Sequence, residues 1–109
     1  MLTEAKKALR VTVDAYDTEI ARLLEAGAKD LETAGVILPG TVAFSEEGGA
    51  VTDASTLADP LAMQAVITYA AMMFGNPPNF ERLRDSYDLQ KTQLMHAAAY
   101  TSYESGDAG

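Results

Sequence analysis

The sequence between residues 59 and 78 reads DPLAMQAVITYAAMMFGNPP and describes a helix with both ends marked. Asp59 is a residue type that caps helix N-termini, and Pro60 suits the first helical position because its missing N–H group is not needed there. Gly75 is typical of a C-terminal stop. The sequence therefore predicts a helix from Pro60 to Phe74, around which the rest of the chain is organised.

This helix is apolar around nearly its whole circumference. When successive residues are placed 100° apart, apolar side chains fill most of the circle, and only Gln64 and Thr68 mark a narrow polar strip. Such a helix is buried in a core or in an interface. Because the helices before and after it offer apolar faces that can cover it, we predict a central core helix with its polar strip toward solvent or the loop.

Length and composition indicate one globular domain. The chain has 109 residues, of which 48% are hydrophobic and 22% are charged. It has no cysteine, which excludes disulfides, thiolate metal sites and a cysteine nucleophile. The N-terminal segment lacks the long apolar run of a signal peptide, and the apolar helix is shorter than the ~20 residues that span a bilayer. We therefore expect a soluble protein that is not exported and has no contact with a membrane.

The charge balance argues against binding to nucleic acid. Sixteen acidic residues against eight basic ones give a formal net charge of −8, and no run of basic residues offsets this. Affinity for nucleic acid comes mainly from Lys and Arg that neutralise backbone phosphates. We therefore expect no specific DNA binding.

Two helices are predicted before the central one. The first runs from Glu4 to about Arg10 with Thr3 as its cap, and residues 11–13 form an extended link. The second begins at Asp14 and ends at Gly35. Its apolar positions fall on one face: Ile20, Leu23, Leu24, Gly27, Ala28, Leu31 and Ala34. On the opposite face, Glu25 and Lys29 have the spacing of an ion pair between adjacent turns.

Residues 36–58 show no helical period. Residues 42–44 and 50–52 have the composition of two short strands around Gly48-Gly49, so this segment is either a long surface loop or a short β-hairpin. A lone two-stranded hairpin is marginal in water, so a surface loop is the alternative interpretation. Long irregular connections are uncommon in compact domains and are often functional, and we take Phe44 as a candidate interface residue.

A final helix is predicted from Phe80 to about Tyr100, with Asn79 as its cap. One side forms a core-facing stripe: Phe80, Leu83, Tyr87, Leu94 and Ala98. The opposite side carries candidate interface residues: Leu89, His96, Tyr100 and Tyr103. The predicted fold is therefore all-α, a small four-helix bundle around a buried central helix. Residues 1–100 form its single domain, and 101–109 form a flexible tail.

No catalytic, metal or cofactor site is predicted. His96 is the only histidine, and no Ser or carboxylate has a spacing that marks it as a partner. Asp14, Asp17 and Glu19 match no calcium-loop spacing, and the helix dipole explains acids at this position. Gly48-Gly49 lacks the Lys-Ser/Thr that follows a phosphate-binding loop. We therefore expect a protein that is not an enzyme.

Four stretches, in this order and spacing, resemble the head-tail connector (head-completion or adaptor) proteins of long-tailed double-stranded DNA bacteriophages. The first is AKKALRVTVD at 5–14, followed by DTEI at 17–20 and LLEA at 23–26. The others are DLETAGV at 30–36, the central helix from DPL at 59–61 to FGNP at 74–77, and FERL at 80–83 with SYDLQK at 86–91. The resemblance covers most of the chain except 38–58 and the tail. The 38–58 segment is longer than the compact connection of such proteins, so its role does not follow from the resemblance.

The resemblance implies a non-enzymatic ring subunit, with twelve copies in the virion. The ring docks beneath the portal protein at the capsid vertex after genome packaging, extends the DNA channel and offers a platform for the stopper or tail-completion protein. DNA passes through without specific binding, and an acidic wall suits this because it repels phosphates. The implied location is the head-tail interface of the virion, and the host cytoplasm during assembly.

Two other functions remain open from the residues alone. An acidic helical interaction module, such as a regulator or anti-repressor, would occupy the basic surface of a protein partner. A small enzyme would depend on His96 and scattered acids. Gene neighbourhood separates the first alternative from a connector, which should lie beside portal, capsid and tail genes.

Overall fold

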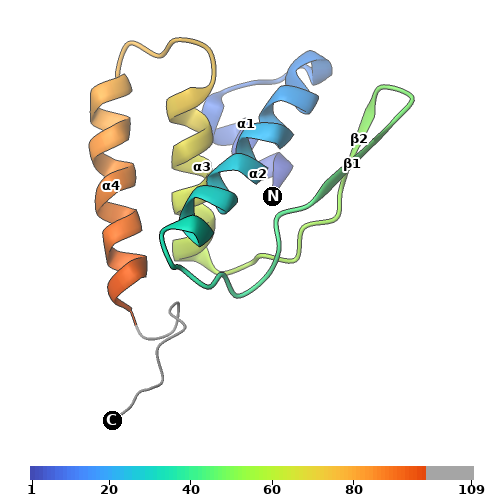
Figure 1. The fold of residues 1–109 in the computed structure, drawn as a ribbon. Coiled ribbons are helices and arrows are strands. Elements are labelled where there is room, and N and C mark those ends of the chain that lie inside the picture. The colour runs from blue at the N-terminus through green and yellow to red at the C-terminus, as the bar shows by residue number, and fades with distance from the viewer. Residues whose placement is uncertain (98–109) are drawn as a thin grey trace.

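A computed structural model describes residues 1–97 of the chain (Figure 1). In chain order the elements are α1 (Leu2–Leu9), a 3₁₀ turn (Asp14–Tyr16), α2 (Asp17–Thr33), β1 (Phe44–Glu47), β2 (Ala50–Asp53), α3 (Pro60–Met73) and α4 (Phe80–His96). The fold is mostly helical, and an antiparallel hairpin connects α2 to α3. This confirms the predicted four helices and decides between the two interpretations of residues 36–58 in favour of the hairpin.

The central helix α3 begins and ends on the predicted signals. The Asp59 carboxylate accepts a hydrogen bond from the backbone N–H of Ala62 at 3.0 Å, and Pro60 occupies the first turn. The helix ends at Met73, one residue earlier than predicted, and Gly75 follows with a φ of +64°. In Figure 1, α3 lies between α4 and the N-terminal helices, and it packs against α1, α2 and α4.

Burial of α3 is less complete than its composition predicts. The buried positions lie on one side of the helix: Ala62, Ala65, Val66, Ala70 and Met72. Gln64 is exposed as predicted and Thr68 is half-buried, but Leu61 is 57% exposed and Met73 is 45% exposed. The prediction of an almost fully buried helix was therefore wrong in the first and last turns. The neighbouring elements that cover the middle of α3 do not enclose its two ends.

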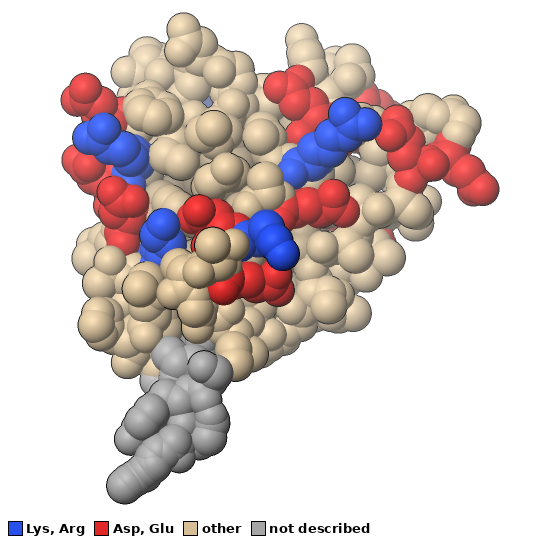
Figure 2. All heavy atoms as spheres, viewed as in Figure 1, with Lys and Arg blue, Asp and Glu red and all other residues tan. Residues whose placement is uncertain are grey.

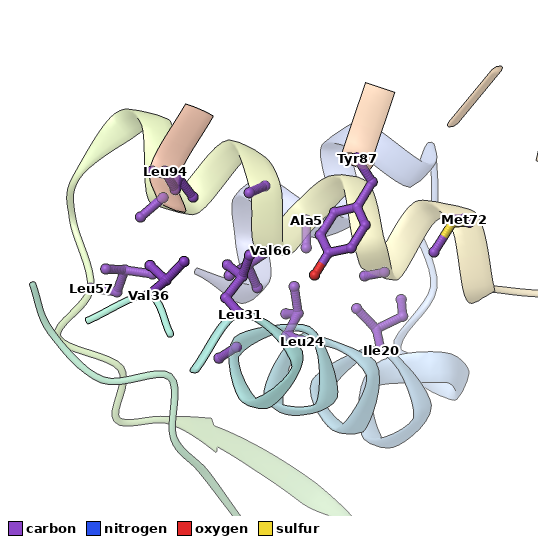
Figure 3. Packing of buried hydrophobic residues seen from close by; sticks show 14 residues of the cluster. Ala5, Ile20, Leu24, Leu31, Val36, Leu57, Val66, Met72, Tyr87 and Leu94 are labelled. Carbon is purple, nitrogen blue, oxygen red and sulfur yellow. The ribbon is translucent and has the colours of Figure 1, made fainter. Parts of the chain in front are cut away.

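The core lies where α2 crosses α3 (Figure 3). The largest fully buried side chains are Ile20, Leu24, Leu31, Val36 and Val66. Gly27 of α2 lies against Tyr69 of α3, and a Cβ atom at residue 27 would be only 3.1 Å from the Tyr69 side chain. The helical phase predicted for α2 is therefore confirmed, and Gly27 is needed because the two helices approach closely there.

The N-terminal helices begin at different residues from those predicted. Helix α1 starts at Leu2 rather than Glu4, and α2 starts at Asp17 because Asp14–Tyr16 form a 3₁₀ turn. The Lys6 ammonium lies 2.9 Å from Asp14 and 2.8 Å from Asp17, so this contact joins α1 to the start of α2. The Lys6 ammonium therefore stabilises Asp14 and Asp17 in addition to the helix dipole.

The hairpin has the turn chemistry that its sequence predicts. Gly48 and Gly49 both have positive φ values, +59° and +83°, as a two-residue type I′ turn requires. Ser45 pairs with Thr52, and Glu46 pairs with Val51. Because side chains alternate along a strand, residues 44, 46, 51 and 53 share the face toward α2, and residues 45, 47, 50 and 52 share the outer face.

Helix α4 is shorter than predicted. It ends at His96, since Ala97 already has extended backbone angles. Tyr87 and Leu94 of the predicted core stripe are buried and Leu83 is half-buried, but Phe80 is 39% exposed. The placement of Phe80 in the core was therefore wrong, because its side chain is neither in the buried cluster nor packed against it. Ala98 and the predicted tail 101–109 lie outside the described residues.

Candidate assembly surface

A hydrogen-bonded cluster of Tyr87, Lys91 and Asp30, which we call the polar latch, joins α4 to α2. The buried Tyr87 hydroxyl donates a hydrogen bond to the Asp30 carboxylate at 2.5 Å, and the Lys91 ammonium lies 3.2 Å from the same oxygen. Lys91 also lies 5.2 Å from the centre of the Tyr87 ring, and Tyr69 meets that ring edge-on at 5.4 Å. Figure 3 shows Tyr87 pointing inward from α4 among the core residues. One side of α4 is therefore committed to holding the fold together.

Titration of the latch follows from these contacts. Burial and the hydrogen bond to ionised Asp30 raise the pKa of the Tyr87 phenol above its usual value. Burial raises the pKa of Asp30, but the hydrogen bonds from Tyr87 and Lys91 outweigh that effect and lower it. The latch is therefore a neutral phenol on a carboxylate at neutral pH.

The opposite side of α4 faces away from the core. Leu89 is 61% exposed and His96 is also exposed. Relative to Tyr87, helical geometry places Arg82, Leu89 and His96 about 220°, 200° and 180° around the helix. We call these three residues the outer face of α4. The structure thus brings the first two predicted interface residues, Leu89 and His96, onto one surface, whereas Tyr100 and Tyr103 lie outside the described residues.

Phe44, the remaining candidate, lies at the base of the hairpin. Its side chain is half-buried against the core, and its backbone N–H donates to the Glu25 carboxylate at 3.1 Å. Glu25 therefore anchors the hairpin and makes no ion pair with Lys29, which corrects the predicted pairing. A second contact of this kind joins the Thr18 hydroxyl to Glu46 at 2.8 Å. A role for Phe44 in an interface stays a prediction.

The other end of the hairpin is tied to α1. The Asp53 carboxylate accepts a hydrogen bond from the Leu2 backbone N–H at 2.8 Å and another from Ser55 at 3.0 Å, and lies 2.9 Å from the Met1 ammonium. An acidic group at a helix N-terminus is favoured by the helix dipole. Burial raises the pKa of Asp53, but these contacts outweigh it and lower the pKa to about 2. Asp53 thus holds the hairpin in a defined position beside α1.

Acidification is expected to weaken this tie. Because the pKa of Asp53 is lower in the folded state than its ordinary value of 3.8, its contribution is present above pH 4 and is lost as the pH falls toward 2. We expect Asp53→Asn to lower the free energy of unfolding at pH 7 by about 1 kcal/mol, the scale of an acid at a helix N-terminus. Urea unfolding at pH 7 and at pH 2.5 measures this. A deficit of equal size at both pH values would contradict the assignment.

Two flanks of the molecule differ in charge (Figure 2). Residues 36–59 contain four acids and no Lys or Arg, and Figure 2 shows acidic side chains along the projecting hairpin. Helix α4 instead carries three basic and three acidic residues, Arg82, Arg84 and Lys91 against Glu81, Asp85 and Asp88. Among the described residues, the exposed side chains of Glu47 at the hairpin tip and Arg82 on α4 have no hydrogen-bond or ion-pair partner, and the same holds for Glu81 and Asp88 on α4.

A shallow groove follows the uncovered side of α3. It is lined by residues of α1 and α3 and the segment before α3, including Ala8, Met63, Gln64 and Ile67. Within residues 1–97, no group of three or more His, Cys, Asp or Glu side chains is placed to hold a metal ion. No helix in this part of the chain is long and apolar enough to cross a membrane.

Several residues that shape this surface have no signal in the local sequence. Asp30 and Tyr87 are 57 positions apart, and nothing in their local patterns links them. The role of Glu25 was missed because its spacing to Lys29 offered a nearer partner. The absence of basic residues between 36 and 59 was the one available signal for an acidic flank.

These features define a small, mostly helical protein with an uncovered side on α4 and a projecting acidic hairpin. The chain belongs to a family of this class: residues 1–101 match the model of the phage connector protein family. Members of this family are structural rather than catalytic, and membership implies a head-tail connector role in the virion, with partners such as the portal protein. Searches of curated proteins and of solved structures found no match.

Proposed function

We propose that this protein is the subunit of a homo-oligomeric ring of twelve copies that docks under the portal at the phage capsid vertex. The ring extends the DNA channel and provides the platform for the stopper or tail after genome packaging. Subunits stay in the host cytoplasm during assembly and then become part of the virion. The one observation that carries the proposal is the connector-family match across residues 1–101.

The exposed side chains support an assembly role. Leu89 is large and apolar, yet more than half of its surface is exposed. It lies on the side of α4 that the fold leaves uncovered. Aromatic and apolar residues are favoured at the centres of protein interfaces. The polar latch explains how α4 stays attached while its other side remains free for a partner.

Electron microscopy of the purified protein with and without its portal tests the proposal. We expect portal particles to gain an additional ring of density that the portal alone lacks. The free protein can remain monomeric, because a template that aligns many copies raises their effective concentration. Portal particles that gain no density at saturating protein would overturn the proposal.

The proposed channel wall should not hold DNA. At −8 net charge the subunit repels phosphates, and we expect no measurable binding of duplex DNA at ~0.15 M salt, where only close charges escape screening. Fluorescence anisotropy with a labelled duplex measures this. As a positive control, a variant with several exposed acids replaced by Lys should gain salt-dependent affinity. Measurable affinity of the unaltered monomer would count against the repelling wall.

A further inference from the structure

We propose that the hairpin of one copy lies against the outer face of α4 of the next copy, and that this contact closes the ring. The inference rests on the proposed ring and names its interface. A ring of identical subunits needs two different patches on each subunit, because its contacts run head to tail. The hairpin and the outer face of α4 are two such patches, and they lie at opposite flanks of the molecule (Figure 1).

The two patches also match in height. In Figure 1 the tip of the hairpin, at Gly48-Gly49, lies level with the first turns of α4. In the proposed ring the axis runs parallel to α3 and α4, and rotation about such an axis keeps every residue at its own height. The hairpin tip of one copy therefore reaches the N-terminal half of α4 in the next copy, where Arg82 is located.

Opposite charges favour contact between the hairpin tip of one copy and the start of α4 in the next copy. Glu47 is an exposed acid without a partner among the described residues, and Arg82 is an exposed base in the same situation. Asp85, which shares the outward side of α4, lies 3.6 Å from Arg84 and is partly neutralised by it. Glu81 and Asp88 are also unpaired, but helical geometry places them about 120° and 100° from Tyr87, off the outer face. An Arg82–Glu47 contact across the interface therefore joins the unpaired base of the outer face of α4 to the acid of the outer face of the hairpin.

The distance from Arg82 to Leu89 along α4 is similar to the length of a strand of the hairpin. Arg82 and Leu89 are seven residues apart, about 10 Å along a helix. A four-residue strand such as β1 covers a similar distance, about 10 Å from Phe44 to Glu47. Ser45 and Thr52, the outer-face pair nearest the base of the hairpin, lie about 7 Å from Glu47 along the strand. With Arg82 at the hairpin tip, Leu89 is therefore close to this pair, on the side toward the base. These side chains are small enough to let Leu89 approach the strands.

The anchors of the hairpin fit this role. Its inner face is held by Glu25, Thr18 and the N-terminus of α1, whereas its outer face is exposed. A two-stranded hairpin is marginal alone, so anchoring on one face and cover on the other make it a defined arm. The arm thus presents its outer face to the neighbouring copy at a fixed angle.

Charge reversal tests the contact. Glu47→Arg and Arg82→Glu each place like charges opposite one another, so each alone should lower the yield of rings on the portal about tenfold or more, because the penalty recurs at every interface. The double variant restores opposite charges and should recover most of the yield. Glu32→Arg on α2 and Lys7→Glu on α1 make the same charge changes elsewhere and should leave the yield unchanged.

A covalent measurement gives an independent answer. The chain has no cysteine, so Glu47→Cys with Arg82→Cys introduces the only two thiols. After assembly on the portal and mild oxidation, we expect a ladder of disulfide-linked multimers on a denaturing gel. Either single variant should give no species larger than a dimer.

The outcomes separate the two proposals. If the unaltered protein adds no ring to the portal, the proposed function fails and this contact fails with it. If rings form but neither reversal reduces them, or the double variant is no better than the single ones, only the contact is overturned. Rings whose paired cysteines give no ladder also overturn the contact and leave the ring standing.

Discussion

Replacing Tyr87 by alanine is expected to lower the free energy of unfolding by about 3–5 kcal/mol, the usual cost of truncating a buried aromatic side chain. Tyr87 is 3% exposed and one of the two buried side chains of α4 among its described residues. Its removal leaves a cavity beside Tyr69 and takes the hydrogen-bond donor from Asp30. Because the free energy of unfolding of most domains is only about 5–15 kcal/mol, this change should leave the protein marginally stable at room temperature.

Urea unfolding followed by circular dichroism measures the effect, and Tyr87→Phe is the matched control. The phenylalanine keeps the ring and its contact with Tyr69 but loses the donor to Asp30. We expect it to cost about 1–2 kcal/mol, since Lys91 still faces the carboxylate. A Tyr87→Ala protein within 1 kcal/mol of the original would show that α4 does not depend on this anchor. Equal losses for both variants would assign the whole effect to the hydrogen bond.

Sequence prediction succeeded best for features that depend on interactions between residues close together in the chain. Helix α3 was predicted almost to the residue, because Asp59, Pro60 and Gly75 act on backbone groups within one turn of themselves. The Gly48-Gly49 turn is local for the same reason. Both local signals could be recognised without knowledge of their neighbours, whereas the choice between a hairpin and a surface loop depended on the contacts from α1 and α2.

Errors arose where a distant segment decides the outcome. Periodicity placed Phe80 on the same side of α4 as Tyr87, but burial depends on which side chains of the other helices reach each position, and the core cluster does not include Phe80. Glu25 had a plausible local partner, yet the Phe44 amide lies nearer in space. The position of Leu89 and His96 on the side of α4 opposite the core was predicted correctly because it needed only the helical period, whereas their role in an interface stays a prediction.

Leu89→Asp is expected to leave the monomer folded and to abolish ring assembly on the portal. Leu89 is 61% exposed, so a charge at this position stays in water and should change the free energy of unfolding by no more than about 0.5 kcal/mol. In the proposed ring the same side chain is buried against the hairpin of the next copy, where an unpaired carboxylate costs several kcal/mol. That cost recurs at each contact, so even a few kcal/mol per interface prevents closure.

Electron microscopy of portal particles and yields of infectious phage measure assembly, and circular dichroism with urea unfolding verifies the fold. Val13→Asp is the control, because Val13 is 52% exposed but lies in the link between α1 and α2. It introduces the same charge into an equally acidic protein, so any general effect of charge on docking should appear in both variants.

A Leu89→Asp protein that builds infectious particles at normal yield would remove the outer face of α4 from the interface. A loss shared equally by Val13→Asp would assign the defect to net charge. Loss confined to Leu89→Asp, with an unchanged monomer, is the result that a ring-closing contact requires.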